Sequence, residues 1–189
     1  MASIMLTGPA AEPLTLAEAK DFLRVTQDDD DSVITALIAS ARVLVEAQTR
    51  RALITQQWRI VRDAWPTNGR VWIAPSPLIA ITAARVYESD GTTVTIDPEN
   101  FAFNAAAAPA HVSFAPWAVP QPGRLTGGIE IDITVGYGGD ASAVPEPLRQ
   151  AMRLLIAHWY ENRAVVASTT SVLPASVSAL LAPFRVVSL

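Results

Sequence analysis

The hydrophobic pattern changes its period twice along the chain, and this change constrains the fold more than any other feature. Between residues 31 and 49 apolar side chains recur at i, i+3 and i+4, as on one face of an α-helix. From residue 56 to about 138 the apolar runs are short, rich in Val, Ile and Trp, and interrupted by Pro and Gly, which is typical of strands and turns. After residue 145 the helical period returns.

Each helical segment carries a start signal. Thr15 is followed three residues later by Glu18, the pattern of a capping box, so a first helix is predicted from residue 16. The aspartates 28–31 precede the second helix, and we expect them to cap its free N–H groups. They lack the alternating ligands, glycine and glutamate of an EF-type calcium loop. Pro145 and Pro147 suit the first turn of a long third helix, where a missing N–H costs nothing.

The strand signals concentrate in the middle of the chain. Residues 129–135 alternate isoleucine or valine with polar residues, which predicts a strand with one buried face and one solvated polar face. Ser89-Asp90-Gly91 predicts a hairpin between two strands. Residues 99–104 and 111–117 are weaker strand candidates, and the Pro-, Gly- and Ala-rich segments around them are predicted to be loops.

Together these patterns predict an α+β protein. Its helical core consists of two N-terminal helices, one long C-terminal helix and a short terminal helix, with an inserted, mostly antiparallel β unit. The predicted N-terminal helical part covers residues 1–55 and the β unit residues 56–138. Residues 139–189 are predicted to form the C-terminal helix and a docking tail that complete the core.

Composition excludes several classes of function. The 189 residues carry a net charge of −4 and only one lysine, Lys20, so the basic surface of a nucleic-acid binder is absent. There are no cysteines, which excludes disulfides, a thiol nucleophile and Cys-ligated zinc. Half of the residues are hydrophobic and 17% are charged, which indicates either a well-filled core or apolar surface covered by partner subunits. We expect no signal peptide and no membrane span.

The segment His158-Trp159-Tyr160-Glu161-Asn162-Arg163 is the best candidate for a catalytic or metal-binding site, because it places a histidine three residues before a glutamate. The only other histidine is His111, and no G-x-S-x-G nucleophile elbow occurs. We therefore expect no catalytic residue, no metal site and no cofactor. Two alternatives stay open: a hydrolase that uses Glu130 or Asp132, and a ligand-binding module that uses the five tryptophans.

The order of these segments resembles the head–tail connector (adaptor) proteins of tailed phages and their counterparts in phage-derived gene transfer agents. The resemblance is carried by residues 28–58, by residues 144–163 and by the terminal residues 173–189, while the β middle matches in outline. Arg50 stands where the family commonly has a glycine that ends the second helix.

The resemblance implies a structural protein without catalysis. Family members form a ring of about twelve copies beneath the portal, extend the DNA channel and join capsid to tail. The implied partners are the portal protein, a tail-side neck protein (a stopper or tail terminator) and further copies of the same chain. DNA passes through without specific binding, and no membrane is involved. The implied location is the neck of a virion or gene transfer agent particle assembled in the bacterial cytoplasm. Another neck component, such as a stopper or tail-completion protein, is the alternative.

The terminal amphipathic segment is the predicted portal contact, because its apolar residues suit docking into a groove on a partner. The alternative is that the segment folds back on its own helical core. The predicted portal-binding residues are Leu173, Pro174, Val177, Leu180, Leu181, Phe184 and Arg185. A second set is predicted to pack between subunits or in the core: Trp58, Trp159, Tyr160 and Arg163.

Overall fold

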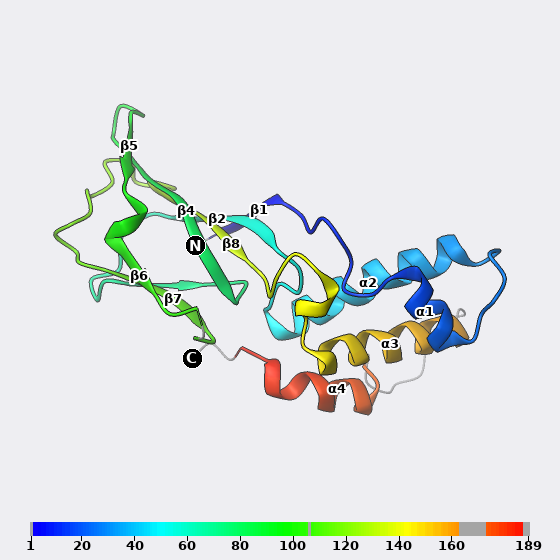
Figure 1. The fold of residues 1–189 in the computed structure, drawn as a ribbon. Helices are drawn as coiled ribbons and strands as arrows, with labels where there is room; N and C mark the ends of the chain where they lie inside the picture. Colours follow the sequence, from blue (N-terminus) through cyan, green and yellow to red (C-terminus); the bar gives the residue numbers. More distant parts are fainter. Residues whose placement is uncertain (1, 106, 163–172, 187–189) are drawn as a thin grey trace. The chain divides into compact units, whose positions relative to one another are not determined.

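The computed structural model describes residues 2–105, 107–162 and 173–186, and it confirms an α+β fold (Figure 1). The elements, in chain order, are β1 (Ala2–Thr7), α1 (Leu16–Leu23), α2 (Asp31–Thr49), β2 (Gln56–Arg62), β3 (Arg70–Ile73), β4 (Leu78–Tyr87), β5 (Thr93–Ile96), η1 (Pro98–Asn100), β6 (Phe101–Phe103), β7 (Ala110–Phe114), β8 (Ile129–Val135), η2 (Ala141–Ala143), α3 (Glu146–Glu161), α4 (Ala175–Leu181) and η3 (Ala182–Phe184).

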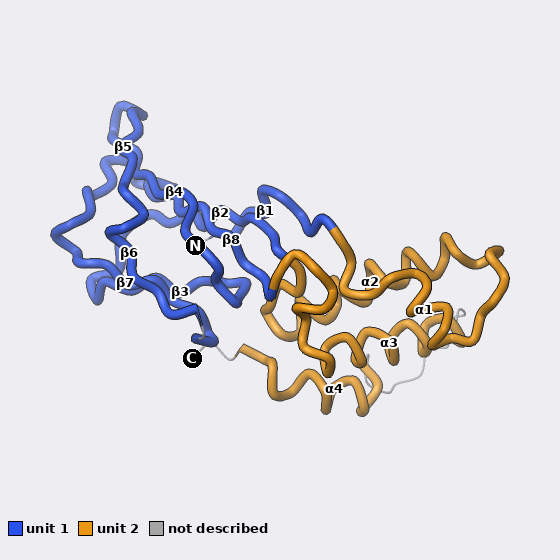
Figure 2. The backbone as a smooth tube through the Cα atoms, viewed as in Figure 1, with its two compact units in different colours: residues 1–10, 55–137, 187–189 blue, residues 11–54, 138–186 orange. Residues whose placement is uncertain are grey.

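The chain forms two compact units, each built from segments that are distant in the sequence (Figure 2). A β unit combines residues 1–10, 55–137 and 187–189, and a helical unit combines residues 11–54 and 138–186. The β unit is therefore not made from the middle of the chain alone, because the N-terminal segment belongs to it as well.

A five-stranded antiparallel sheet, in the order β1-β2-β8-β4-β5, is the larger part of the β unit. Its central strand β8 has the predicted alternation: Ile129, Ile131, Ile133 and Val135 are fully buried on one face. The predicted hairpin is also present, since β4 pairs with β5 and Gly91 turns between them with φ 88°. Glycine has no Cβ and adopts this left-handed conformation at little cost.

The second sheet has three antiparallel strands in the order β3-β7-β6, so both weaker strand candidates are confirmed. Trp65 lies beside this sheet, with its ring centroid 4.8 Å from that of Phe114 and 6.0 Å from that of Phe101. Its indole Nε1–H donates to the Pro120 carbonyl at 2.8 Å. The aromatic cluster fills the interior of the β unit while its one polar atom is satisfied.

Strand β1 is absent from the sequence-based prediction. All six of its residues are exposed, so no alternation of buried and exposed positions marks it in the sequence. It is an edge strand: within the described part of the chain it pairs with β2 and with no other strand. Backbone hydrogen bonds, which leave no hydrophobic pattern, hold it in place.

The helical unit packs α2 against α3, α3 against α4, and α1 against both α2 and α3. The capping box at the start of α1 is confirmed: Glu18 N–H donates to Thr15 Oγ1 at 3.2 Å, and Thr15 N–H donates to Glu18 Oε2 at 2.8 Å. Leu148 and Leu155 of α3 and Ile34 of α2 are among the fully buried side chains. Burial of these apolar stripes provides most of the stabilisation of short helices in water.

The prediction that aspartates cap α2 is wrong in its detail. Asp30 occupies the cap position without a side-chain hydrogen bond to the helix. Asp28 and Asp31 instead accept hydrogen bonds from Lys20 Nζ at 2.6 Å each, and Asp30 accepts one from the Tyr160 hydroxyl. These carboxylates tie neighbouring helices together, which outweighs local capping.

Helix α2 ends at Thr49, and the next residue, Arg50, takes the left-handed conformation with φ 54° and ψ 35°. An arginine there places Cβ close to the following carbonyl, at a cost of roughly 1–2 kcal/mol that a glycine would avoid. The helix thus ends at the place where a glycine would end it, without the glycine.

Helix α2 is also long and apolar enough to cross a membrane by length and composition alone, a test that core helices of water-soluble proteins pass as well. In the structure Ile34, Ile38 and Val45 of this helix are buried within the helical unit. Arg42 pairs with Glu46 on the same helix at 3.1 Å and with Glu12 at 2.8 Å.

Candidate docking surfaces

The terminal segment folds onto the helical unit in this structure. Val177 and Leu181 are fully buried and Leu173 is nearly so, whereas Pro174 and Leu180 are half-buried. The spacing of Val177 and Leu181 places them on one side of α4, and this side faces the neighbouring helices α3 and α2. Three of the predicted portal-binding residues, Leu173, Val177 and Leu181, are therefore core residues of the single chain.

The other end of the segment stays at the surface. Phe184 is half-buried and Arg185 is exposed. Arg51 Nε donates to the Phe184 carbonyl at 2.7 Å, and the Val186 N–H donates to the Thr49 carbonyl at 3.1 Å. The end of α2 thus holds the backbone of the tail, and the exposed Arg185 side chain also donates from Nη2 to Gln48 Oε1 at 3.5 Å.

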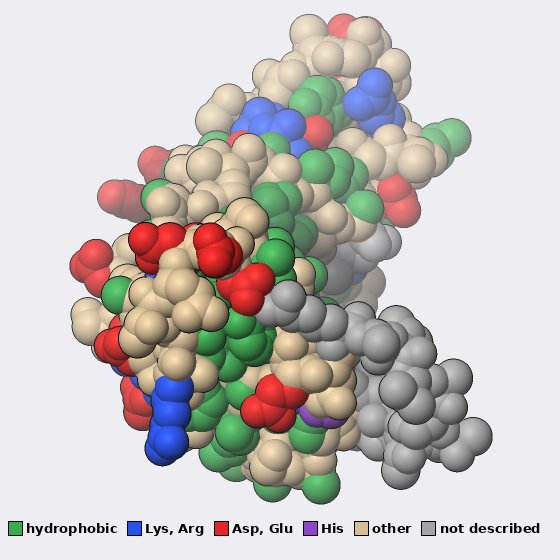
Figure 3. Space-filling view, turned by 90° about the vertical axis from the view of Figure 1, so that its right-hand side faces the viewer, with side chains coloured by type: hydrophobic (Ala, Val, Ile, Leu, Met, Phe, Trp, Pro, Cys, Tyr) green, Lys and Arg blue, Asp and Glu red, His purple; other side chains and the backbone are tan. Residues whose placement is uncertain are grey.

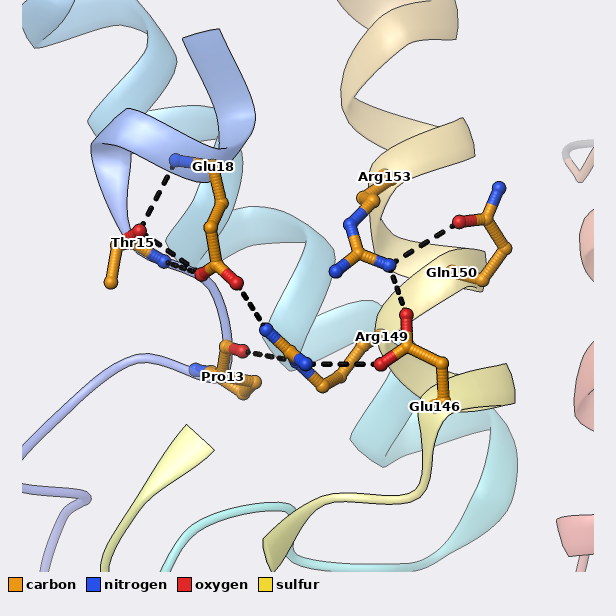
Figure 4. Close-up of polar contacts among 7 residues, drawn as sticks. All are labelled: Pro13, Thr15, Glu18, Glu146, Arg149, Gln150 and Arg153. Atoms are coloured by element: carbon orange, nitrogen blue, oxygen red, sulfur yellow. Dashed lines mark hydrogen bonds and ion pairs between the residues drawn. The ribbon is translucent and has the colours of Figure 1, made fainter. Parts of the chain in front are cut away.

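A charge network joins the start of α1 to the start of α3 (Figure 4). Arg149 donates to the Pro13 carbonyl at 3.1 Å and to Glu146 at 3.0 Å, and it pairs with Glu18. Arg153 pairs with the same Glu146. A backbone hydrogen bond from Thr15, together with Arg149, holds the pKa of Glu18 below its usual value. A hydrogen bond from Arg153 lowers the pKa of Glu146.

A second charge network lies on the polar face of the five-stranded sheet. Arg59 of β2 binds Asp132 of β8 through two hydrogen bonds, Nε–Oδ1 at 2.7 Å and Nη2–Oδ2 at 3.0 Å. Arg85 of β4 pairs with the same carboxylate. Glu130 lies 3.3 Å from Arg59 and accepts a hydrogen bond from the Tyr87 hydroxyl at 3.1 Å.

This polar face was predicted to be solvated, and that expectation is wrong. Asp132 is only 8% exposed. Burial alone would raise the pKa of Asp132, but the hydrogen bonds and charges of Arg59 and Arg85 outweigh burial and hold its pKa below the usual value. Arginine side chains bind both oxygens of the Asp132 carboxylate, which is the arrangement of a structural ion pair.

The His158–Asn162 segment forms the end of α3. His158 is exposed, and its carbonyl accepts hydrogen bonds from the Asn162 N–H at 3.1 Å and from Asn162 Nδ2 at 2.8 Å. Trp159 and Tyr160 are half-buried, and Arg163 lies outside the described residues. Among the residues that the structure describes, no group of three or more His, Asp or Glu side chains is arranged to hold a metal ion.

The tryptophans are distributed over different environments. Trp58 is half-buried and donates through Nε1 to Gln56 Oε1 at 3.0 Å, and Trp65 is a core residue. Trp72 is half exposed and meets the edge of His111, whereas Trp117 is 89% exposed in the loop before β8. Side chains this unequal in burial do not form one platform for a sugar or base.

Figure 3 shows one face of the molecule, on which acidic side chains surround patches of hydrophobic ones. The helical unit contributes exposed acids such as Asp28 and Asp29 and exposed apolar side chains such as Phe22 and Val33. Surface of this kind favours contact with proteins over contact with nucleic-acid phosphates.

Sequence reasoning missed both charge networks and strand β1. The positions of Glu146, Arg149 and Arg153 at i, i+3 and i+7 are a signal for the helical network. For the sheet network, the alternation in β8 marks residues 130 and 132 as positions on the polar face. Nothing in the sequence indicates their partners, residues 59 and 85, because these lie on other strands.

Comparison with solved structures gives matches over the whole chain. A chain in the neck of an empty gene transfer agent particle, with C6 symmetry, is 27% identical, with a TM-score of 0.85; the match covers 100% of this chain and 97% of that one. A chain in the virion of a native gene transfer agent particle is 27% identical, with a TM-score of 0.83 and the same coverage. A third, in the neck of a native particle with C12 symmetry, is 26% identical, with a TM-score of 0.78 and again the same coverage.

None of the curated proteins matches the chain. A family model described as the phage gp6-like head-tail connector protein matches residues 13–107, which is half of the chain. This region includes α1, α2 and the strands from β2 to β6. The chain belongs to the phage gp6-like head-tail connector family.

Proposed function

We propose that the chain is one subunit of a homo-oligomeric ring in the neck of a phage-like particle. There it lies beneath the portal, extends the DNA channel and joins the capsid to the tail. The observation that carries this proposal is the similarity, over the full length of the chain, to neck chains of particles with C6 and C12 symmetry. Cyclic symmetry of this order supports a ring of about twelve copies.

The connector family is structural, and the chain is not an enzyme, so its working residues are contacts. The proposed partners are the portal protein, a tail-side stopper or tail terminator, and further copies of the chain. DNA slides through the ring without specific binding, because a net charge of −4 gives little attraction for phosphates.

The surface part of the terminal segment is the proposed portal contact. Phe184 and Arg185 carry it, with Pro174 and Leu180 beside them. Detachment of the whole segment would expose Val177 and Leu181, which are fully buried, at roughly 1.5–3 kcal/mol for each side chain. Val177, Leu181 and Leu173 therefore hold α4 in place while the tips of the segment reach the portal.

The test is recovery of the tagged chain from cells that produce the particle, followed by sedimentation and cross-linking to identify its neighbours. We expect the chain in the particle fraction, cross-linked through residues 184–185 to the portal protein. Recovery as a small species without capsid or tail proteins would overturn the proposal. Cross-links to tail proteins alone would indicate a different neck component, such as a stopper.

Charge reversal separates docking from folding. Arg185→Glu is expected to change the melting temperature little, because the side chain is exposed and its hydrogen bond to Gln48 is long, at 3.5 Å. The same substitution is expected to lower recovery in particles at least tenfold. Arg24→Glu, at another exposed arginine of the helical unit, is the matched control and is expected to enter particles normally. Equal recovery of both variants would remove Arg185 from the contact.

A further inference from the structure

Strand β1 leaves an apolar edge open to solvent. Ile4, Met5 and Leu6 are 49%, 46% and 44% exposed. Residues 2–7 include no charged residue and no proline, the features that normally protect an edge strand from pairing with another chain. Among the described residues, no strand pairs with the outer side of β1.

The opposite edge of the same sheet, strand β5, is similarly unprotected. Its sequence, Thr-Val-Thr-Ile, also has neither charge nor proline, and three of its four residues are exposed. Val94 is a large apolar residue there, 37% exposed. In the part of the chain that the structure describes, no further strand pairs with β5 either, so the sheet ends in two different open edges.

Each edge places one exposed apolar side chain on the same face of the sheet. Met5 lies opposite Trp58, which lies opposite Ile133, so Met5 belongs to the apolar face of the sheet. Val94 lies opposite Val86, which lies opposite Ile129, so Val94 belongs to that same face. On the other face, β1 presents Ile4 and β5 presents Thr93 and Thr95.

Strand directions favour a rotational arrangement. Each neighbouring pair in the sheet is antiparallel, so β1 and β5, the first and fifth strands, run in the same direction. Rotation about a ring axis does not reverse a strand's direction along that axis. A cyclic ring also needs two different surfaces that complement each other on every copy, and the two edges meet this requirement.

We propose that the free edge of β1 pairs in parallel with the free edge of β5 on the neighbouring copy of this chain. The five-stranded sheets then join edge to edge around the ring, with Met5 beside Val94 on the apolar face. This inference rests on the proposed ring and names the surfaces that close it. Main-chain hydrogen bonds supply the attachment, and the contact of Met5 with Val94 sets which faces of the two sheets align.

The absence of cysteine allows a direct test. Position 4, 5 or 6 is changed to cysteine together with position 93, 94 or 95, with Met5→Cys plus Val94→Cys as the leading pair. Directly opposite residues of paired strands have Cβ atoms about 5 Å apart, so oxidation or a short thiol cross-linker joins them. The cross-linking is done on purified particles, and Met5→Cys alone and Val94→Cys alone are the controls.

The expected result is a ladder that extends beyond the dimer for at least one double variant, and monomers for each single variant. The ladder is reducible where oxidation to a disulfide forms the link. Dimers from Met5→Cys alone would show two-fold pairing of β1 with β1 and overturn the proposal. If particles contain the chain but no cysteine pair gives a ladder, the edge pairing is overturned, while the proposal of a ring in the particle neck still stands. Absence of the unsubstituted chain from particles would overturn the proposed function and this inference together.

A charge at the edge gives a second readout that needs no cross-link. Met5→Lys is expected to keep the melting temperature of the free chain, since the side chain is 46% exposed, and to reduce recovery in particles at least tenfold. Met5→Leu keeps the apolar surface and is expected to enter particles normally. Normal recovery of Met5→Lys would contradict the proposed edge pairing.

Discussion

The two charge networks have the same composition and differ in the burial of their acids. Each consists of two arginines and two carboxylates: Arg59, Arg85, Glu130 and Asp132 in the β unit, and Arg149, Arg153, Glu18 and Glu146 in the helical unit. The side chains of Glu130 and Asp132 are 16% and 12% exposed. Those of Glu18 and Glu146 are 37% and 61% exposed.

This difference decides what each network contributes. The arginines do not separate the networks in this way, since those of the sheet are 24–25% exposed and those of the helical unit 15%. An exposed carboxylate is well hydrated with or without its partner, so its ion pairs stabilise by only about 0–1 kcal/mol. A buried carboxylate interacts with its arginines where water screens little, and removing it from such a pair is far more costly. The number of ion pairs therefore says little about stability until the burial of each group is known.

The largest effect is expected for Asp132→Ala. The substitution leaves Arg59 and Arg85 with Glu130 as their only carboxylate, which gives the half-buried network a net positive charge. We expect a loss of about 3 kcal/mol in the free energy of unfolding, measured by urea denaturation. Thr134→Ala on the same strand face is the control, with an expected loss below about 1 kcal/mol. Equal losses of unfolding free energy in the two variants would show that the buried carboxylate of Asp132 contributes no more than an ordinary side chain on the same strand.

Acid should remove the contribution of Asp132 in the intact protein. Its pKa is lower in the folded state than in the unfolded state, so the stabilisation is fully present above the unfolded value of about 4 and is lost as the pH falls through the folded value. In Asp132→Asn the free energy of unfolding should change less between pH 7 and pH 3 than in the unsubstituted chain. Parallel pH curves for the two proteins would contradict a lowered pKa.

A smaller loss is expected for Arg149→Met, which keeps most of the apolar stem and removes the guanidinium. Glu18 would keep its hydrogen bonds from Thr15, and Glu146 would keep Arg153. The Pro13 carbonyl loses its donor, and we expect a loss of about 1–2 kcal/mol, measured by urea denaturation. A loss as large as that of Asp132→Ala would show that exposure of the acids does not separate the two networks.

The helices and strands of this molecule are easier to predict from the sequence than its ion pairs. The buried stripe of α3 and the alternation of β8 repeat within one segment, so their periods are readable from the chain alone. Arg59 and Asp132 are 73 positions apart, and Arg149 and Glu18 are 131 apart, so only the folded topology pairs them. Strand β1 had no period to read, because both of its faces are exposed.

The same contrast holds at the predicted docking tail. The spacing of Val177, Leu180, Leu181 and Phe184 identified an amphipathic segment correctly, but it did not say what covers the apolar side. In the single chain that cover is the helical unit, which buries Val177 and Leu181 completely. An amphipathic pattern shows that a face must be covered and leaves the identity of the cover to the three-dimensional structure.

The smallest effect is expected for Glu146→Gln. Glu146 is the most exposed of the eight charged groups, and it pairs with Arg149 at 3.0 Å and with Arg153. Glutamine keeps the size and one acceptor oxygen, so the loss should be about 0.5 kcal/mol at low salt. In 1 M salt, where the Debye length is about 3 Å, the difference from the unsubstituted chain should vanish, whereas the loss in Asp132→Ala should persist. If salt removed both losses equally, burial would not be what distinguishes the sheet network from the helical one.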